Sequence, residues 1–209
     1  MSHIDLTQAK SHFKHADPTM YELVERATKA AHPIAIPKQK SPNEYFGSIV
    51  TSIISQQIST KAADAVRARV EAYLTELTPE RVRACDNEKL QACGLSGQKV
   101  RYILHNAAAW DTVPTAEFPN MPDDEVIKEL TKLYGIGTWT AEMFLIFSLA
   151  RPNVFSYGDL GLMNSLYREY EYYPHYTKKI RDTVNAWSPH KTAASLALWH
   201  TTDNGPVLL

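Results

Sequence analysis

Two features of the sequence have the residue types and the spacing of a functional site. One is a glycine-cornered turn, Gly135-Ile136-Gly137, and the other is an acid, Asp159, which lies 22 residues after Gly137. Glycines allow positive φ and a close approach of the backbone to another molecule. A helix that starts at Thr138 adds free N–H groups, so the turn could bind an anion while Asp159 supplies a carboxylate. The turn could also be a simple glycine C-cap, and the acid an ordinary helix N-cap.

The elements on both sides of the turn have the reach to bring the acid back to it. Residues 123–133 carry apolar side chains at helical spacing behind an acidic first turn, which suits the helix dipole. Residues 138–149 predict a second helix, which rises roughly 18 Å away from the turn. Residues 151–158 span up to about 26 Å when extended. The chain is therefore long enough to return Asp159 beside the N-terminus of the second helix.

Several stretches of the sequence together resemble one family. They are Leu-Tyr-Gly-Ile-Gly-Thr-Trp-Thr-Ala at 133–141, Val-Phe-Ser-Tyr-Gly-Asp-Leu-Gly-Leu at 154–162, Gln-Gln-Ile-Ser at 56–59 with Ala62 and Ala63, and the run from Trp187 to Trp199. The combination covers roughly residues 43–202. It is similar to the helix-hairpin-helix DNA glycosylases, and most similar to their 3-methyladenine DNA glycosylase II branch.

The apolar patterns are helical and lack the alternation of a strand, so the chain is predicted to be all-α. The resemblance implies the helix-hairpin-helix DNA glycosylase fold, with two helical subdomains flanking an active-site cleft. We expect residues 1–42 to form an N-terminal arm, a helix and a proline-rich linker that pack on the C-terminal half. Residues 43–133 would form one helical subdomain. Residues 134–209 would hold the hairpin, the catalytic acid and the C-terminal helices.

The resemblance also implies an activity. The family hydrolyses the N-glycosidic bond of alkylated purines, of the 3-methyladenine and 7-methylguanine type, in base excision repair. Breaking this bond builds positive charge on the sugar, which a fixed carboxylate stabilises, and Asp159 would be that catalytic group. It could also orient or deprotonate the attacking water. Relatives that also cut the strand have a lysine two residues after the second hairpin glycine. Because that position is Trp139, we expect a monofunctional enzyme without lyase activity.

A base pocket is expected from aromatic rings, because a cationic base over an aromatic face gains roughly 0.5 to 2 kcal/mol. The resemblance places Trp139 and Trp199 as walls of this pocket, although tryptophan in a helix is more often core. Met143 stands where some relatives have a further aromatic residue, and Lys191 stands where an arginine is common. Met143 in place of an aromatic residue bears on the range of bases that the enzyme accepts. Lys191 in place of an arginine would weaken a bidentate contact to DNA.

The expected DNA contacts fall in several short stretches. Ile58, flanked by amides in a short connection, could be the wedge that fills the space of an everted base, or it could dock under the neighbouring helix. In relatives, main-chain carbonyls at the positions of Thr131, Leu133 and Ile136 bind a monovalent cation, Na+ or K+, together with DNA. The predicted DNA-binding residues are Gly135, Ile136, Gly137, Thr138, Thr140, Gln57, Ile58, Ser59, Ser96, Lys99 and Lys191.

Bulk composition limits the other possibilities. The formal net charge is −1 and the pI is about 6.7, which argues against indiscriminate binding to phosphate backbones. Two cysteines, Cys85 and Cys93, cannot supply the four-cysteine iron-sulfur cluster of some relatives, and no other cofactor is expected. No apolar run is long enough for a membrane span. We expect an intracellular monomer, cytoplasmic in a bacterium or nuclear in a eukaryote, whose partner is double-stranded DNA with a damaged base.

Two other functions fit the same residues. The same fold could act on uracil, on thymine mismatched with guanine or on an oxidised purine. The chain could instead be a non-catalytic helix-hairpin-helix module that only holds a phosphate. Base release that depends on Asp159 separates an enzyme from such a module.

Overall fold

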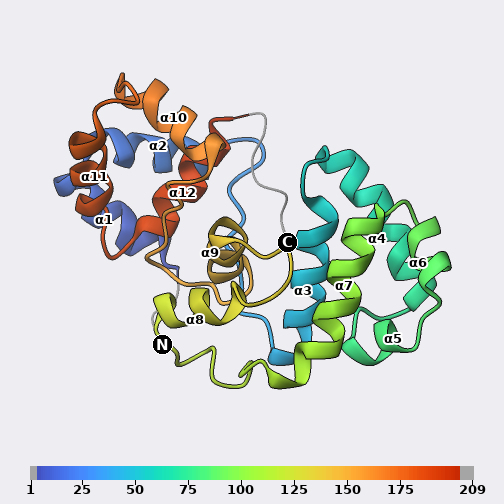
Figure 1. The fold of residues 1–209 in the computed structure, drawn as a ribbon. Helices are drawn as coiled ribbons and strands as arrows, with labels where there is room; N and C mark the ends of the chain where they lie inside the picture. The colour runs from blue at the N-terminus through green and yellow to red at the C-terminus, as the bar shows by residue number, and fades with distance from the viewer. Residues whose placement is uncertain (1–3, 203–209) are drawn as a thin grey trace. The chain divides into compact units, whose positions relative to one another are not determined.

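The computed structural model describes residues 4–202, and all of their regular elements are helices (Figure 1). The all-α prediction is therefore confirmed. The contacts divide these residues into two compact units. We call residues 39–149 the continuous unit, and residues 4–38 with 150–202 the discontinuous unit.

The helices of the continuous unit follow one another along the chain, whereas those of the discontinuous unit come from both ends of it. The continuous unit contains α3 (Pro42–Ser55), α4 (Thr60–Leu74), α5 (Pro79–Arg83), α6 (Asn87–Ala92), α7 (Gly97–Ala109), the 3-10 helix η1 (Trp110–Thr112), α8 (Asp123–Leu130) and α9 (Thr138–Phe147). The discontinuous unit contains α1 (Leu6–Ala16), α2 (Pro18–Lys29), α10 (Leu160–Tyr170), α11 (Thr177–Ala186) and α12 (Lys191–His200).

The boundary between the units differs from the predicted one. We expected the hairpin and residues 134–149 to belong with Asp159, but the contacts place the division between Leu149 and Ala150. The cause is α9, which is buried along most of its length and packs against α3 and α8. A helix that is apolar nearly all round stays with the core that buries it. The first boundary also lies earlier than expected, after residue 38 instead of residue 42.

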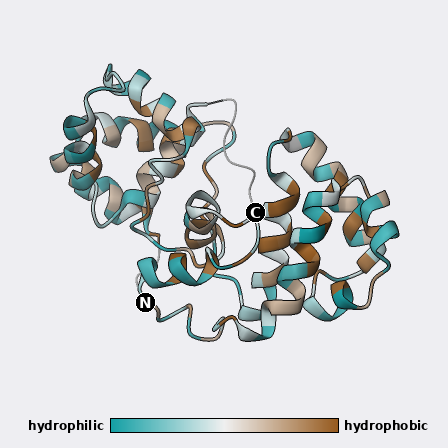
Figure 2. Ribbon diagram, in the orientation of Figure 1, coloured by the Kyte–Doolittle hydropathy of each residue, from teal (hydrophilic) through white to brown (hydrophobic). Residues whose placement is uncertain are grey.

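α3 forms the centre of the continuous unit because most of its residues are apolar. Tyr45, Phe46 and Ile53 are each at most 1% exposed, and the helix contacts α4, α7 and α9. The ribbon of α3 is brown over much of its length in Figure 2, whereas α8 is mostly teal. Tyr45 and Phe144 form an edge-to-face pair with ring centroids 5.1 Å apart, which joins α3 to α9. These contacts hold the helices whose ends carry many of the predicted site residues.

A buried carboxylate joins the N-terminal helices of the discontinuous unit to the C-terminal ones. Asp17 is 8% exposed and caps α2 by accepting the Met20 N–H at 3.0 Å. Its Oδ2 accepts the Tyr170 hydroxyl at 2.8 Å and the Trp187 indole N–H at 2.7 Å. Burial and the nearby Asp17 charge raise the pKa of the Tyr170 hydroxyl, so that it remains a donor. α2 and α10 both pack on α12, and the unit is thereby closed around one core.

We predict that Asp17→Ala destabilises the protein by about 2 to 4 kcal/mol. The change leaves the Tyr170 hydroxyl and the Trp187 N–H without their acceptor and removes the cap of α2. Urea denaturation followed by tryptophan fluorescence measures the loss. Asp182→Ala, which removes only an exposed pair with Lys178, is the control and should cost less than about 1 kcal/mol. Equal stability of the two variants would contradict this role of Asp17.

Candidate active site

The predicted hairpin is present between α8 and α9. After α8 ends, the Leu133 N–H donates to the Leu130 carbonyl at 3.0 Å, and the Ile136 N–H donates to the Leu133 carbonyl at 3.2 Å. α9 begins at Thr138, and its N-cap is Gly137, which has no side chain to cap the helix. The first turn of α9 therefore presents N–H groups that Gly137 does not cap, and the helix dipole favours an anion there.

The two hairpin glycines are needed for different reasons. Gly135 has a φ of +76°, and a Cβ built on it would lie 2.2 Å from Cδ2 of Tyr102. The fold itself therefore requires glycine at position 135. Gly137 has a φ of −97°, and a Cβ built on it would meet nothing within 4 Å. The space over Gly137 is open, as a closely approaching ligand requires.

Side chains from α7 and the end of α3 hold the hairpin in place. Asn106 is fully buried, donates to the Tyr134 carbonyl at 3.0 Å and accepts the Tyr134 N–H at 2.8 Å. The Gln56 amide donates to the Gly135 carbonyl at 2.8 Å. The ring of His105 lies 3.7 Å from that of Tyr134, centroid to centroid. Our sequence reasoning missed Asn106, although an asparagine on the apolar face of a helix is the kind of residue that needs a buried polar partner.

A hollow of about 360 Å³ lies beside the hairpin, entirely within the continuous unit. Amides, hydroxyls and glycine backbone form most of its wall, and the Trp139 ring, which is 40% exposed, adds an aromatic surface. Gln56, which belongs to the predicted wedge stretch, lines it as well, and so do Gln98 and Tyr102, which were not predicted. The predicted site residues that the hollow brings together are Gln57, Ser96, Lys99, Gly135, Gly137, Trp139 and Thr140.

Three of the predicted DNA-binding residues also have a clear structural role. The Lys99 ammonium donates to the Ile54 carbonyl at 2.7 Å and to the Gln56 carbonyl at 2.8 Å, and so caps the end of α3. Partial burial lowers the pKa of Lys99. Ser59 and Ser96 are the N-caps of α4 and α7. The fold thus already holds these three side chains in place. A phosphate contact by any of them remains a prediction.

The structure gives the exposure of Ile58, which bears on its two interpretations. Ile58 is 39% exposed, and Gln57 and Ser59 on either side are exposed as well. This exposure is compatible with the wedge role, which stays a prediction. In the hairpin, Thr138 is exposed but Ile136 is only 5% exposed. A ligand would therefore meet Ile136 through its backbone.

Asp159 is the N-cap of α10 in the discontinuous unit. Its Oδ1 accepts the Leu162 N–H at 2.7 Å and the Trp199 indole N–H at 3.0 Å. Asp159 is 7% exposed, whereas Tyr157 is 45% and Leu160 is 78% exposed. Asp159 therefore does cap α10, as its ordinary interpretation predicted. A second donor from α12 fixes the orientation of the same oxygen, which a cap alone does not need.

Two of the predicted base-pocket residues are buried. Trp199 is 4% exposed, and its indole N–H donates to Asp159 at 3.0 Å. Met143 is 1% exposed because it lies on α9, whose side chains are nearly all buried. Of the three predicted pocket residues, Trp139 is the most accessible, at 40% exposed. A place for Trp199 and Met143 in the wall of a base pocket stays a prediction.

The remaining predictions concern Lys191 and the metal. Lys191 begins α12 and donates to the Asn185 side chain at 3.2 Å, and partial burial lowers its pKa. No three His, Cys, Asp or Glu side chains in residues 4–202 are gathered as a metal site would need. The predicted Na+ or K+ site uses main-chain carbonyls, so this observation does not test it, and it stays a prediction. In the same residues, no helix is both long and apolar enough to cross a membrane.

The fold and the site define a class of protein. An all-helical chain with a glycine-cornered hairpin, a helix start without a side-chain cap and a helix-capping acid after it is typical of helix-hairpin-helix proteins that act on DNA. The family described as HhH-GPD superfamily base excision DNA repair protein matches residues 50–189, and the chain belongs to this superfamily. The family prediction is confirmed.

Similar proteins come from bacteria and yeasts. The chain is 32% identical to DNA-3-methyladenine glycosylase 1 of Schizosaccharomyces pombe, over 94% of this chain and 87% of that protein. It is 27% identical to DNA-3-methyladenine glycosylase 2 of Escherichia coli, over 75% of this chain and 54% of that protein. A crystal structure of a Bacillus halodurans DNA-3-methyladenine glycosidase has a TM-score of 0.78 and 32% identity, with 96% and 92% of the two chains covered. A Schizosaccharomyces pombe 3-methyladenine DNA glycosylase in complex with abasic DNA has a TM-score of 0.74 and 29% identity, with 92% and 95% covered.

The difference between the hairpin glycines gives a stability test. Gly135→Ala should lower the free energy of unfolding by about 2 kcal/mol or more, because alanine is strained at this φ and its Cβ meets the Tyr102 ring. Gly137→Ala is the matched control and should change the stability by less than about 1 kcal/mol. Thermal and urea unfolding of both variants measure the difference. A larger loss for Gly137→Ala would show that our account of the turn is wrong.

Proposed function

We propose that this chain is a monofunctional DNA glycosylase that hydrolyses the N-glycosidic bond of alkylated purines, such as 3-methyladenine and 7-methylguanine, in duplex DNA. The observation that carries the proposal is the Asp159 carboxylate, held by the Leu162 N–H and the Trp199 indole in a protein of a base excision repair superfamily. The names of the relatives support this choice of base, because each of the two curated proteins above is a DNA-3-methyladenine glycosylase.

The chemistry of the bond explains why one fixed carboxylate is enough. As the bond from the sugar to the base breaks, positive charge develops on the sugar, and a preorganised negative group stabilises it without reorganisation. An alkylated purine is cationic and leaves as a neutral base, so its departure needs no acid from the protein. Asp159 would also orient the water that attacks the sugar. The two donors on Oδ1 keep the carboxylate in one orientation during this step.

The identity of residue 139 supports hydrolysis by water over attack by an amine. A lyase reaction needs a lysine that forms a covalent adduct with the sugar. Trp139 occupies the position two residues after Gly137 and cannot do this. Its ring, 40% exposed, would instead offer a π-face to a cationic base. The product would then be an abasic site in an uncut strand.

The hairpin would hold the DNA through its backbone. The N–H groups at the start of α9, which Gly137 does not cap, and the clear space over Gly137 suit a phosphate oxygen. A Na+ or K+ ion would be held by the carbonyls of Thr131, Leu133 and Ile136, and would link the turn to the phosphate. The Leu133 carbonyl already accepts the Ile136 N–H at 3.2 Å, and its second lone pair remains for a cation. We propose that the protein needs no other cofactor. We also propose that it acts as a monomer inside the cell, on the cell's own DNA.

The catalytic assignment is tested with Asp159→Asn. We expect this variant to release 7-methylguanine from a duplex about a hundredfold or more slowly than the wild type, because a neutral amide cannot balance the charge on the sugar. Abasic sites, scored by alkaline cleavage, measure the rate under single-turnover conditions. Binding of an abasic duplex by the same variant is the control and should persist. Undiminished release would remove Asp159 from the mechanism, and no release by the wild type from any alkylated duplex would favour a binding module.

The role of Trp199 gives a separate prediction. Trp199→Phe keeps an aromatic ring in the core but removes the N–H that reaches Asp159 at 3.0 Å. Loss of one hydrogen bond to a carboxylate corresponds to about 1.5 to 3 kcal/mol, so the single-turnover rate should fall roughly 10- to 150-fold. The apparent dissociation constant for the duplex should change little, because the residue positions the carboxylate and does not hold DNA. An unchanged rate with weaker binding would instead support the pocket-wall role.

A further inference from the structure

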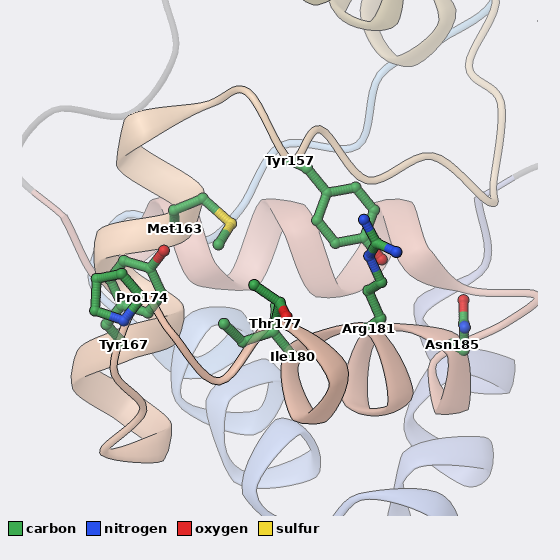
Figure 3. Close-up of a pocket in the computed structure, with 8 residues that line it drawn as sticks. All are labelled: Tyr157, Met163, Tyr167, Pro174, Thr177, Ile180, Arg181 and Asn185. Atoms are coloured by element: carbon green, nitrogen blue, oxygen red, sulfur yellow. The ribbon is translucent and has the colours of Figure 1, made fainter.

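A second cavity lies in the discontinuous unit, between the start of α10 and α11. It has a volume of about 490 Å³, within the range of small-molecule sites. Figure 3 shows Tyr157 and Met163 on one side, Tyr167 and Ile180 at the base, and Arg181 rising from α11 toward the Tyr157 ring. Neither the hairpin nor the Asp159 carboxylate lines it. The proposed glycosylase reaction gives it no role.

The cavity combines aromatic surface with one unpaired positive charge. Arg181 is exposed, and within residues 4–202 it forms no salt bridge, whereas Lys178 in the preceding turn is paired with Asp182 at 2.6 Å. From Tyr172 to Lys191 the sequence contains four Lys or Arg residues and one acid, in a chain of net charge −1. The guanidinium is therefore available for an anion.

The aromatic walls are suited to a flat ring. Tyr157 is 45% exposed, and burial still raises the pKa of its hydroxyl. Part of this side chain is thus shielded while its remaining surface is open. Tyr167 is half-buried and lines the same cavity with Met163, whose thioether makes favourable contacts with aromatic rings. A planar, uncharged ring would gain stacking and dispersion energy here.

We propose that this cavity binds one unpaired nucleotide of single-stranded DNA, with the base against the tyrosine rings and the adjoining phosphate at Arg181. Aromatic stacking next to a basic side chain is how proteins bind single strands without sequence preference. A cationic alkylated base is disfavoured by Arg181, and a purely apolar ligand would leave the guanidinium without a partner. A base within a duplex has its faces covered by its neighbours, so only an unpaired nucleotide fits.

This site is independent of the catalytic proposal. Tyr157 precedes Asp159 by two residues, but the proposed strand contacts are made by the tyrosine rings and the Arg181 guanidinium, and Asp159 does not line the cavity. If Asp159→Asn kept full activity, the single-strand site would be unaffected. If the cavity failed to bind a strand, base release from a duplex could still depend on Asp159.

Photocrosslinking locates the bound strand directly. An octathymidylate with one 5-iododeoxyuridine is irradiated with the full-length protein, and the crosslinked peptide is identified by mass spectrometry. The proposal expects a crosslink at Tyr157 or Tyr167. Crosslinks confined to the Trp139 hollow beside the hairpin, or to neither place, would overturn it.

Paired variants test the two parts of the site in a fluorescence anisotropy titration with labelled octathymidylate. Arg181→Gln should weaken binding about three- to tenfold at low salt, and more than Lys178→Gln, which makes the same charge change outside the cavity.

Tyr157→Leu should weaken binding about fivefold or more, whereas Tyr173→Leu, at a more exposed tyrosine that does not line the cavity, should have a smaller effect. All four positions are exposed, so the variants should keep the fold.

Three results would contradict the proposal. Equal losses within each pair would mean that only general charge or general aromatic surface matters. Displacement of the octamer by thymidine monophosphate at the same concentration would identify a free nucleotide as the ligand. Displacement by an acidic tyrosine-containing peptide as effective as unlabelled octathymidylate would point to a protein partner.

Discussion

The hydrogen bond from the Trp199 indole to Asp159 is the contact on which the proposed chemistry depends. It joins α12 to the start of α10, so a carboxylate that would otherwise only cap a helix is held by two elements at once. One oxygen receives both donors, and the orientation of the group is fixed before any substrate arrives. A preorganised charge of this kind avoids the reorganisation that water would require. The Asp17 network serves the same unit by tying its N-terminal helices to the C-terminal ones.

The hairpin solves a different problem, because its useful groups belong to the backbone. A backbone that offers N–H groups to a ligand cannot also satisfy them internally, so the turn must be held from outside. Asn106 holds Tyr134 through both of its amide atoms, and Gln56 holds the Gly135 carbonyl. Tyr102 packs so tightly on position 135 that only glycine fits. The side chains that make the turn rigid are thus not the groups that would bind DNA.

The sequence predicts the local parts of this structure well and the long-range parts poorly. The helix start at Thr138 and the cap at Asp159 follow from residue type and position alone, and the structure has both. The partner of the Trp199 N–H lies 40 residues away, and no spacing rule identifies it. The division after Leu149 was missed because an apolar helix such as α9 shows no face that indicates its neighbour. Nor does the sequence show that the Lys99 ammonium donates to two carbonyls at the end of α3.

The net charge of the chain limits how it can bind DNA. A chain with a net charge of −1 cannot rely on a general positive field to bind DNA, so its contacts must be local. Backbone N–H groups at a helix start carry partial positive charge without adding to the formal net charge of the chain. Because they do not titrate, this partial charge is the same at every pH. In the proposed single-strand site, the Arg181 guanidinium would likewise attract a phosphate at short range, beside the tyrosine rings. Binding by a few oriented groups depends less on salt concentration than binding by a broad basic surface. The positions of these groups then determine which part of a nucleic acid is bound.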